Sequence, residues 1–221
     1  MRGTDGQVVS DASDIFNTFF HSVFTIDDNN ILEFASRTNA QMPKPLFNTY
    51  EVRTVLFASK TSNACGPDGC PAKFLKLFPE LCIPLIYIYN MSLNQQRLPT
   101  AWKQAHVIPI FKGKGSKMEA ENYRPISLTN VFCKAMESLI RSRIMQHLEA
   151  NSLISQAQAG FRTGHSTLSQ LLLAKSMLVE NINDRACVDG VYADLSKAFD
   201  SISQRKLLIK LRAYSINDIV C

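Results

Sequence analysis

A short apolar segment that ends at Asp194 and then turns polar sets the strongest limit on the fold of this chain. Val188, Val191 and Tyr192 favour a β-strand. A carboxylate at the end of a buried strand is costly unless it is compensated, and a divalent metal ion is the usual compensation. The alternative is that Asp194 closes a turn or caps a helix. Because residues 203–213 follow as an amphipathic helix, the segment predicts an α/β fold.

A second feature is a predicted antiparallel hairpin. Residues 105–111 and 123–128 read as strands and flank a tip rich in lysine and glycine. A triphosphate needs cations, and Lys112, Lys114 and Arg124 are placed to supply them. Arginine adds a planar fork that can hold two phosphate oxygens. The alternative is an ordinary solvated charged loop.

Apolar residues at helical spacing predict several helices around this hairpin. The longest covers about 130–150 and has a basic outer face. Trp102 is predicted to support the core or the hairpin, and Gly66-Pro-Asp-Gly69 predicts a turn with a structural role. Further helices are expected within 8–24, over 50–57, from Pro71 onward and after Ser166-Thr167.

The composition is that of a chain with a buried core and a modest positive charge. Its 221 residues, 46% of them hydrophobic, can form one large or two small units. Lysine and arginine number 24 against 19 acidic residues, a net charge of +5, and the excess gathers in 103–117 and 205–212. Clustered cations suit a phosphate backbone, so we expect binding that weakens with salt.

The cysteines and the hydropathy indicate an intracellular protein of the nucleus, the cytoplasm or both. The 6 cysteines are scattered, without a Cys-x-x-Cys pair or a secretory signal, and read as reduced thiols rather than disulfides or zinc ligands. The histidines show no metal-binding spacing. No apolar run reaches the ~18 residues of a membrane span, so neither secretion nor a membrane partner is expected.

Four blocks of sequence, in order, resemble those of one enzyme family. Residues 191–202 resemble the first catalytic motif of reverse transcriptases, in the form typical of non-LTR (LINE-type) retrotransposons, with Ala193 where that pattern has leucine. The resemblance covers roughly residues 60 to 215, and an ordered series is far harder to obtain by chance than one match. The three earlier blocks are Gly66–Gly69 with Pro71 and Phe74–Lys76, Trp102–Lys112 with Asn122–Leu128, and Gln158–Arg162 with Ser166-Thr167 and Gln170-Leu171.

The resemblance implies an RNA-directed DNA polymerase that uses two Mg²⁺ ions, an RNA template, a DNA primer and deoxynucleoside triphosphates. In the family, the aspartate at the Asp194 position binds both metals, and the backbone carbonyl at Leu195 completes one metal shell. The side chain at Phe199 stands under the sugar and excludes a 2′-hydroxyl. Arg124 and a hairpin lysine, of which Lys112 is a candidate, contact the incoming nucleotide. Which lysine reaches the phosphates stays open.

Other basic residues are candidate contacts for the template and primer backbones. They are Lys114 and Lys117 on the hairpin tip and Arg162 in the third block. The family analogy puts the Arg162 loop near the template strand, and a surface salt bridge is the alternative for this residue.

The resemblance also implies the organisation of a right-hand polymerase with an α/β (α+β) fold. We expect an N-terminal helix and linker in 1–50, with the linker at 36–48. Fingers with an antiparallel hairpin and the start of the palm follow in 51–185, and the first catalytic strand and helix of the palm in 186–221.

The family's second catalytic motif ends in paired aspartates, and the chain shows such a pair only at Asp27-Asp28, in a polar turn. One carboxylate cannot hold two ions against their hydration, so we expect a fragment that binds Mg²⁺ weakly at best and is inactive alone. The alternatives are a non-catalytic nucleic-acid-binding remnant of a transposable element and a group II intron-type reverse transcriptase.

Overall fold

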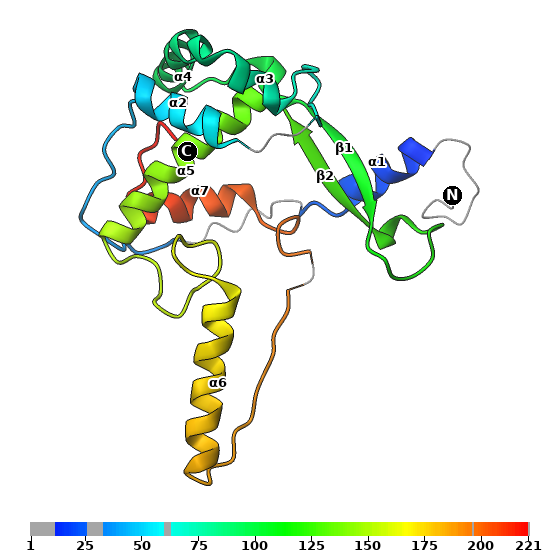
Figure 1. The fold of residues 1–221 in the computed structure, drawn as a ribbon, viewed down its shortest axis with the longest axis vertical. Coiled ribbons are helices and arrows are strands. Elements are labelled where there is room, and N and C mark those ends of the chain that lie inside the picture. Colours follow the sequence, from blue (N-terminus) through cyan, green and yellow to red (C-terminus); the bar gives the residue numbers. More distant parts are fainter. Residues whose placement is uncertain (1–11, 26–32, 60–62, 196, 221) are drawn as a thin grey trace.

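The computed structural model describes residues 12–25, 33–59, 63–195 and 197–220. The described chain combines helices with one two-stranded antiparallel sheet (Figure 1), which confirms the expected mixture of helix and sheet. Short 3-10 helices connect the larger elements at Pro79–Leu81 (η1), Thr100–Lys103 (η2) and Ala120–Asn122 (η3). The α-helices and strands are α1 (Ala12–Ser22), α2 (Thr49–Ala58), α3 (Ala72–Leu77), α4 (Cys82–Gln95), β1 (Ala105–Phe111), β2 (Tyr123–Thr129), α5 (Val131–Ala150), α6 (Thr167–Asn183) and α7 (Gln204–Ala213).

The main core lies where α2, α3, α4 and α5 meet. Leu56, Leu75 and Tyr89 are fully buried there. The Tyr89 hydroxyl donates a hydrogen bond of 2.9 Å to the carbonyl of Phe132, so its one polar group is satisfied inside the core. Trp102 packs at the edge of the core, with its ring in a T-shaped contact 5.7 Å from that of Tyr89. This contact confirms that the single tryptophan supports the core.

Side-chain caps explain where α2 and α5 begin. Asn48 accepts a hydrogen bond from the backbone of Glu51 at 3.0 Å, and the Glu51 carboxylate accepts one from the backbone of Asn48 at 3.2 Å. Asn130, itself buried, starts α5 by accepting a hydrogen bond from the Phe132 amide at 2.9 Å. Both helices were predicted from the sequence, and both are confirmed.

The turn at Gly66–Gly69 packs against the end of β2. The amide of Gly69 donates to the carbonyl of Gly66 at 3.0 Å. A Cβ atom on Gly66 would lie 2.7 Å from the backbone carbon and oxygen of Thr129, so this close approach requires glycine. The predicted turn is therefore confirmed together with its structural role, and α3 begins directly after Pro71 as expected.

The predicted hairpin is formed by β1 and β2, which pair in register from Ala105 opposite Thr129 to Phe111 opposite Tyr123. It projects from the helical core, and α1 lies along its outer part (Figure 1). Phe16 of α1 is buried and makes an edge contact of 4.8 Å with Tyr123. The helix expected within 8–24 is thus confirmed over 12–22, whereas its first residues and the polar turn at 27–30 lie outside the described residues.

The segment expected as a linker, 36–48, contains no helix or strand but packs against the body. Met42 and Phe47 are buried within it. The backbone of Arg37 donates to the carbonyl of Ala213 at 2.8 Å, and that of Met42 to the carbonyl of Ser215 at 3.0 Å. The backbone hydrogen bonds therefore hold this segment beside the end of α7, while its apolar side chains are buried, a role that its polar composition did not predict.

The region from α6 to residue 195 differs most from the expectations. The helix after Ser166-Thr167 is confirmed as α6, but none of its described residues is buried. The strand predicted to end at Asp194 is wrong, because residues 186–195 have no regular secondary structure and Tyr192 is 97% exposed. A strand needs a neighbour for its backbone hydrogen bonds, and the only sheet among the described residues is the hairpin. The helix expected after this segment is confirmed as α7.

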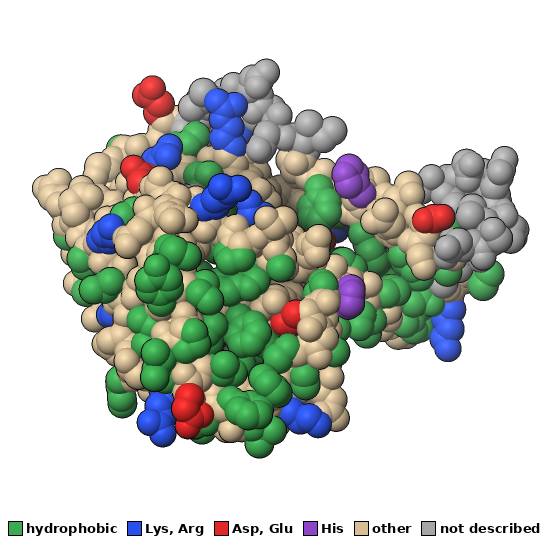
Figure 2. Space-filling model, turned by 90° about the horizontal axis from the view of Figure 1, so that it is seen from above, with side chains coloured by type: hydrophobic (Ala, Val, Ile, Leu, Met, Phe, Trp, Pro, Cys, Tyr) green, Lys and Arg blue, Asp and Glu red, His purple; other side chains and the backbone are tan. Residues whose placement is uncertain are grey.

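Apolar side chains also reach the surface over α3 and α4. Viewed from above, this face carries many apolar side chains between scattered charges (Figure 2). Exposed members on these two helices and on the segment between them are Phe74, Leu77, Phe78, Ile83 and Tyr87. Among the residues that the structure covers, no helix is long and apolar enough to cross a bilayer.

Candidate nucleotide-binding site

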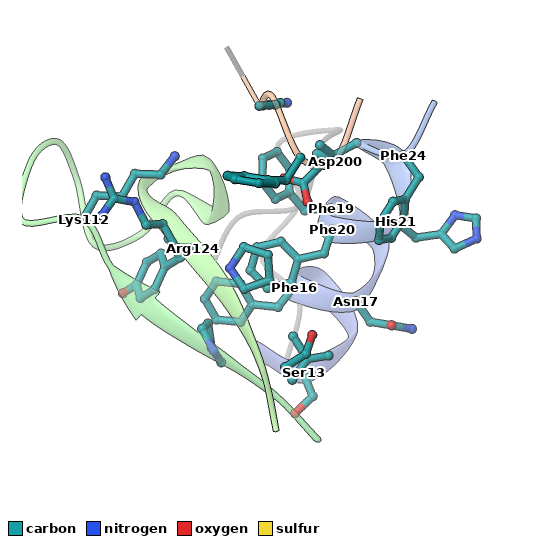
Figure 3. A pocket seen from close by; sticks show the side chains of 18 of the residues that line it. Ser13, Phe16, Asn17, Phe19, Phe20, His21, Phe24, Lys112, Arg124 and Asp200 are labelled. Carbon is teal, nitrogen blue, oxygen red and sulfur yellow. The ribbon is translucent and has the colours of Figure 1, made fainter. Parts of the chain in front are cut away.

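A cavity of about 910 Å³ lies between α1, the hairpin and the turn at 197–200 (Figure 3). Three residues that the sequence singled out for nucleotide binding, Lys112, Arg124 and Phe199, all line it. They come from two different parts of the chain, so the fold brings together what the sequence predicted separately.

The hairpin supplies the cationic wall. Arg124 stands on β2 opposite Ile110, and Lys112 follows the end of β1. The backbone of Lys112 donates to the carbonyl of Asn122 at 2.8 Å, and its amine donates to the carbonyl of Glu121. Arg124 is exposed to solvent, and its guanidinium has no hydrogen bond to the described residues. A planar fork of this kind can hold two oxygens of an anion.

Helix α1 supplies an aromatic wall. Phe16 stacks on Phe20 with ring centroids 5.6 Å apart, and Phe19 meets Phe20 edge-on at 5.8 Å. All three rings line the cavity. The sequence analysis assigned this helix no part in the site. The sequence signal of this helix was the recurrence of phenylalanine at 16, 19, 20 and 24. This spacing indicates one face of a helix, but it does not identify the element that the face contacts.

The third wall is the turn from Lys197 to Asp200. The amides of Asp200 and Ser201 both donate to the carbonyl of Lys197 at 3.0 Å, and Lys197 itself has a left-handed backbone with φ of 52°. The Lys197 amine lies 5.4 Å from the centroid of the Phe19 ring, in a cation–π contact that joins this turn to α1.

Phe199 sits on this turn with its ring 76% exposed. Phe161 is its aromatic neighbour, at 6.3 Å and almost perpendicular. Phe161 has a left-handed backbone with φ of 62°, which is unusual for a bulky residue, and its carbonyl accepts a hydrogen bond from Arg141 at 3.2 Å. This contact places Phe161, in the third sequence block, beside Phe199, in the block at 191–202.

The predicted metal ligands, Asp194 and the carbonyl of Leu195, lie outside the lining of this cavity, and both residues are exposed. In the described ranges, no group of three or more histidine, cysteine, aspartate or glutamate side chains is close enough to hold a metal ion. Mg²⁺ prefers six oxygen ligands, of which these two residues can offer only a few. The described residues therefore do not fit a two-metal centre, although reverse transcriptases in general use divalent metal ions.

The remaining basic candidates fall into two environments. Lys114 lies on the exposed tip between two glycines with positive φ, and the Lys117 amine lies 5.7 Å from the ring of Phe111. Arg162 is different, because its side chain is only 11% exposed and its Nε lies 3.8 Å from the Glu149 carboxylate. The structure thus gives Arg162 the ion pair that the sequence analysis held as the alternative.

The cysteines stand apart from this cavity. Cys65, Cys70, Cys82, Cys133 and Cys187 carry free thiols. Burial raises the pKa of the Cys133 thiol to about 11, with a further contribution from the carboxylate of Glu137. Burial also raises the pKa of the Cys70 thiol, and Asp68 adds to that effect. Both thiols are therefore protonated near neutral pH.

Comparisons with known proteins identify the family of this chain. The pattern of the family described as "Reverse transcriptase (RNA-dependent DNA polymerase)" matches residues 112–221. The chain is 31% identical over 178 residues to the probable RNA-directed DNA polymerase from transposon BS of Drosophila melanogaster, which covers 79% of this chain and 20% of the relative.

Two further relatives from Drosophila melanogaster are similar to the same extent. The probable RNA-directed DNA polymerase from transposon X-element is 30% identical over 172 residues, or 77% of this chain and 19% of that protein. The RNA-directed DNA polymerase from mobile element jockey is 30% identical over 175 residues, or 78% of this chain and 19% of that protein. The chain thus spans about a fifth of the length of these relatives. It belongs to the reverse transcriptase family and is homologous to the RNA-directed DNA polymerases of non-LTR retrotransposons.

Proposed function

We propose that this chain forms the fingers and the first part of the palm of an RNA-directed DNA polymerase, and that the cavity receives an incoming deoxynucleoside triphosphate. The observation that carries the proposal is the convergence of Lys112, Arg124 and Phe199 on one cavity. In this scheme 1–50 are the N-terminal helix and linker, 51–185 the fingers and start of the palm, and 186–221 the first catalytic segment.

The two hairpin cations hold the triphosphate. A triphosphate carries several negative charges, and Arg124 can bind two of its oxygens through parallel N–H donors. Lys112 adds a point charge at the same edge of the cavity. Preorganised cations next to a developing negative charge are also what a pyrophosphate leaving group requires.

Phe199 acts on the sugar. Its exposed ring is the part of the turn that can lie under a bound ribose, and a bulky ring there would collide with a 2′-hydroxyl. That group is what distinguishes a ribonucleotide from a deoxyribonucleotide. Phe161 braces the ring from the side at 6.3 Å.

Asp194 and the Leu195 carbonyl would supply oxygen ligands to Mg²⁺ together with residues that the described part does not contain. Lys114, Lys117 and Arg162 would contact the backbones of the RNA template and DNA primer, and binding there would weaken as salt rises. Arg162 would first have to leave Glu149.

Binding of dATP with Mg²⁺ to the purified chain, followed by titration calorimetry, tests the nucleotide site. Arg124→Ala should weaken binding by roughly 10-fold or more, because it removes charge-assisted hydrogen bonds. Arg97→Ala is the matched control, since Arg97 is also exposed but does not line the cavity. Equal losses in the two variants, or no loss in either, would contradict the proposal.

A second candidate function is a non-catalytic nucleic-acid-binding protein derived from a transposable element. The observation that favours it is the exposed, isolated position of Asp194 among the described residues. Such a protein would bind an RNA–DNA hybrid with a strong salt dependence and would not bind dATP, so the same titrations separate the two functions. The group II intron alternative is less well supported, because the relatives compared above are polymerases of non-LTR retrotransposons.

A further inference from the structure

We propose that α1 forms the nucleobase-binding wall of the cavity, with Phe19 and Phe20 stacking against the base of the nucleotide whose phosphates the hairpin holds. This inference rests on the proposed nucleotide site and extends it to a helix that lies outside all four sequence blocks of the family.

Two of the three walls of the cavity differ in chemistry and face each other. Lys112 and Arg124 rise from the hairpin at one edge, and the rings of α1 point into the space from the other side (Figure 3). A nucleoside triphosphate has the same division, since one end is a flat aromatic base and the other a chain of phosphates. Proteins that bind unpaired strands likewise combine a cationic groove for the phosphates with aromatic side chains on which the bases stack.

The aromatic residues of α1 divide into an anchor and an open face. Phe16 is 8% exposed, and its edge contact with Tyr123 fixes the helix on the hairpin. Phe19 and Phe20 follow at i+3 and i+4 on the same side of the helix, and both are only half-buried. If these rings served packing alone, we would expect them to be covered as Phe16 is. Their remaining surface faces the cavity instead.

The size of the cavity fits this occupant. A volume of about 910 Å³ lies in the range of small-molecule and cofactor sites, and most such sites pair apolar walls with a few placed polar groups. Lys197 lies over the ring of Phe19, where the turn at 197–200 meets α1. Because stacking uses the ring faces that every base has, we expect the four bases to bind with similar affinity.

The test compares two ligands and two sets of variants by titration calorimetry. The ligands are dATP and inorganic tripolyphosphate, which carries the charges without a base. The double variant Phe19→Leu/Phe20→Leu keeps apolar helix formers at both positions and leaves the Phe16 anchor in place. It should weaken dATP binding about tenfold and change tripolyphosphate binding less than twofold. Phe57→Leu, on α2 and away from the cavity, is the matched control and should change neither.

A conservative pair separates stacking from support of the fold. Phe19→Tyr/Phe20→Tyr retains both rings and should keep most of the dATP affinity. An equal loss of both ligands in the leucine variant would overturn the inference, because the rings would then merely maintain the cavity. So would a wild-type chain that binds tripolyphosphate as tightly as dATP.

A different set of results would contradict the proposed nucleotide site itself. In that case neither ligand binds the wild-type chain, or Arg124→Ala leaves both affinities unchanged. If Arg124→Ala weakens both ligands and the leucine variant weakens neither, the phosphate site stands and only the base-binding wall is wrong.

Discussion

The helical core and α6 both have apolar residues at helical spacing, but these residues are buried in the core and exposed in α6. In the core, apolar residues at helical spacing such as Val52 and Leu56 of α2 are completely buried. In α6, Leu168, Leu171 and Leu172 recur at the same spacing, and each is more than half exposed. Figure 1 shows the reason, since α2 to α5 surround one another whereas α6 extends away from them.

This difference separates two sources of helix stability. The core helices gain from apolar burial, at roughly 25 cal/mol for each Å² removed from water. Helix α6 is supported locally by the capping box in which Ser166 and Ser169 exchange hydrogen bonds at 3.1 Å. Most of the stability of a helix in a protein comes from packing of its apolar face, and no residue of α6 is buried. Periodicity thus reports which face a helix would bury, and neighbouring elements decide whether it is buried.

The largest expected effect comes from replacing a core leucine by alanine, compared with the same replacement in α6. Leu56→Ala removes a fully buried side chain and should lower the free energy of unfolding by about 2–5 kcal/mol. Leu168→Ala removes an exposed one and should change it by less than about 0.5 kcal/mol. Urea unfolding, followed by the fluorescence of Trp102 beside the core, measures both. Similar losses would show that α6 is packed in solution, and the contrast drawn here would be wrong.

The same contrast explains which predictions from sequence succeeded. The hairpin and α5 were predicted because their signals are local, namely a cationic tip between two apolar strands and a long apolar stripe with a basic outer face. The resemblance to reverse transcriptases identified Arg124 and Phe199, and both line the cavity. Both residues were identified through their motifs, and their roles in nucleotide binding stay predictions.

The predictions that were wrong or missing concern segments whose structure depends on a partner elsewhere in the chain, which the local sequence does not identify. The predicted strand before Asp194 has the right residue types, but Val191 is 94% exposed because no described strand pairs with it. The aromatic wall of α1 was missed for the complementary reason, since the contact between Phe16 and Tyr123 joins segments far apart in the chain. The segment before Asp194 lacks a partner strand among the described residues, whereas α1 has a partner in the hairpin that its own sequence did not indicate.

A glycine pair sharpens the comparison at an intermediate magnitude. Gly66→Ala would place a Cβ atom 2.7 Å from the backbone of Thr129, which cannot move without disturbing β2. We expect a loss of about 1–3 kcal/mol in the free energy of unfolding. Gly160→Ala, in the loop that leads toward α6, meets no atom within 4 Å and should be nearly neutral. Thermal or urea unfolding of the two variants checks this, and a neutral Gly66→Ala would mean that the turn is not held against β2.

The smallest expected effect tests whether α6 folds with the rest of the chain. Asn130→Ala removes the buried cap of α5, leaves the Phe132 amide without its 2.9 Å partner, and should cost about 1–2 kcal/mol of global stability. Ser166→Ala removes the cap of α6, and because no residue of that helix is buried, global stability should change by less than about 0.3 kcal/mol. The loss should appear instead as faster hydrogen exchange of the α6 amides alone, measured by mass spectrometry. If Ser166→Ala lowers the unfolding midpoint as much as Asn130→Ala does, then α6 unfolds together with the core, and its exposed apolar face is covered in solution.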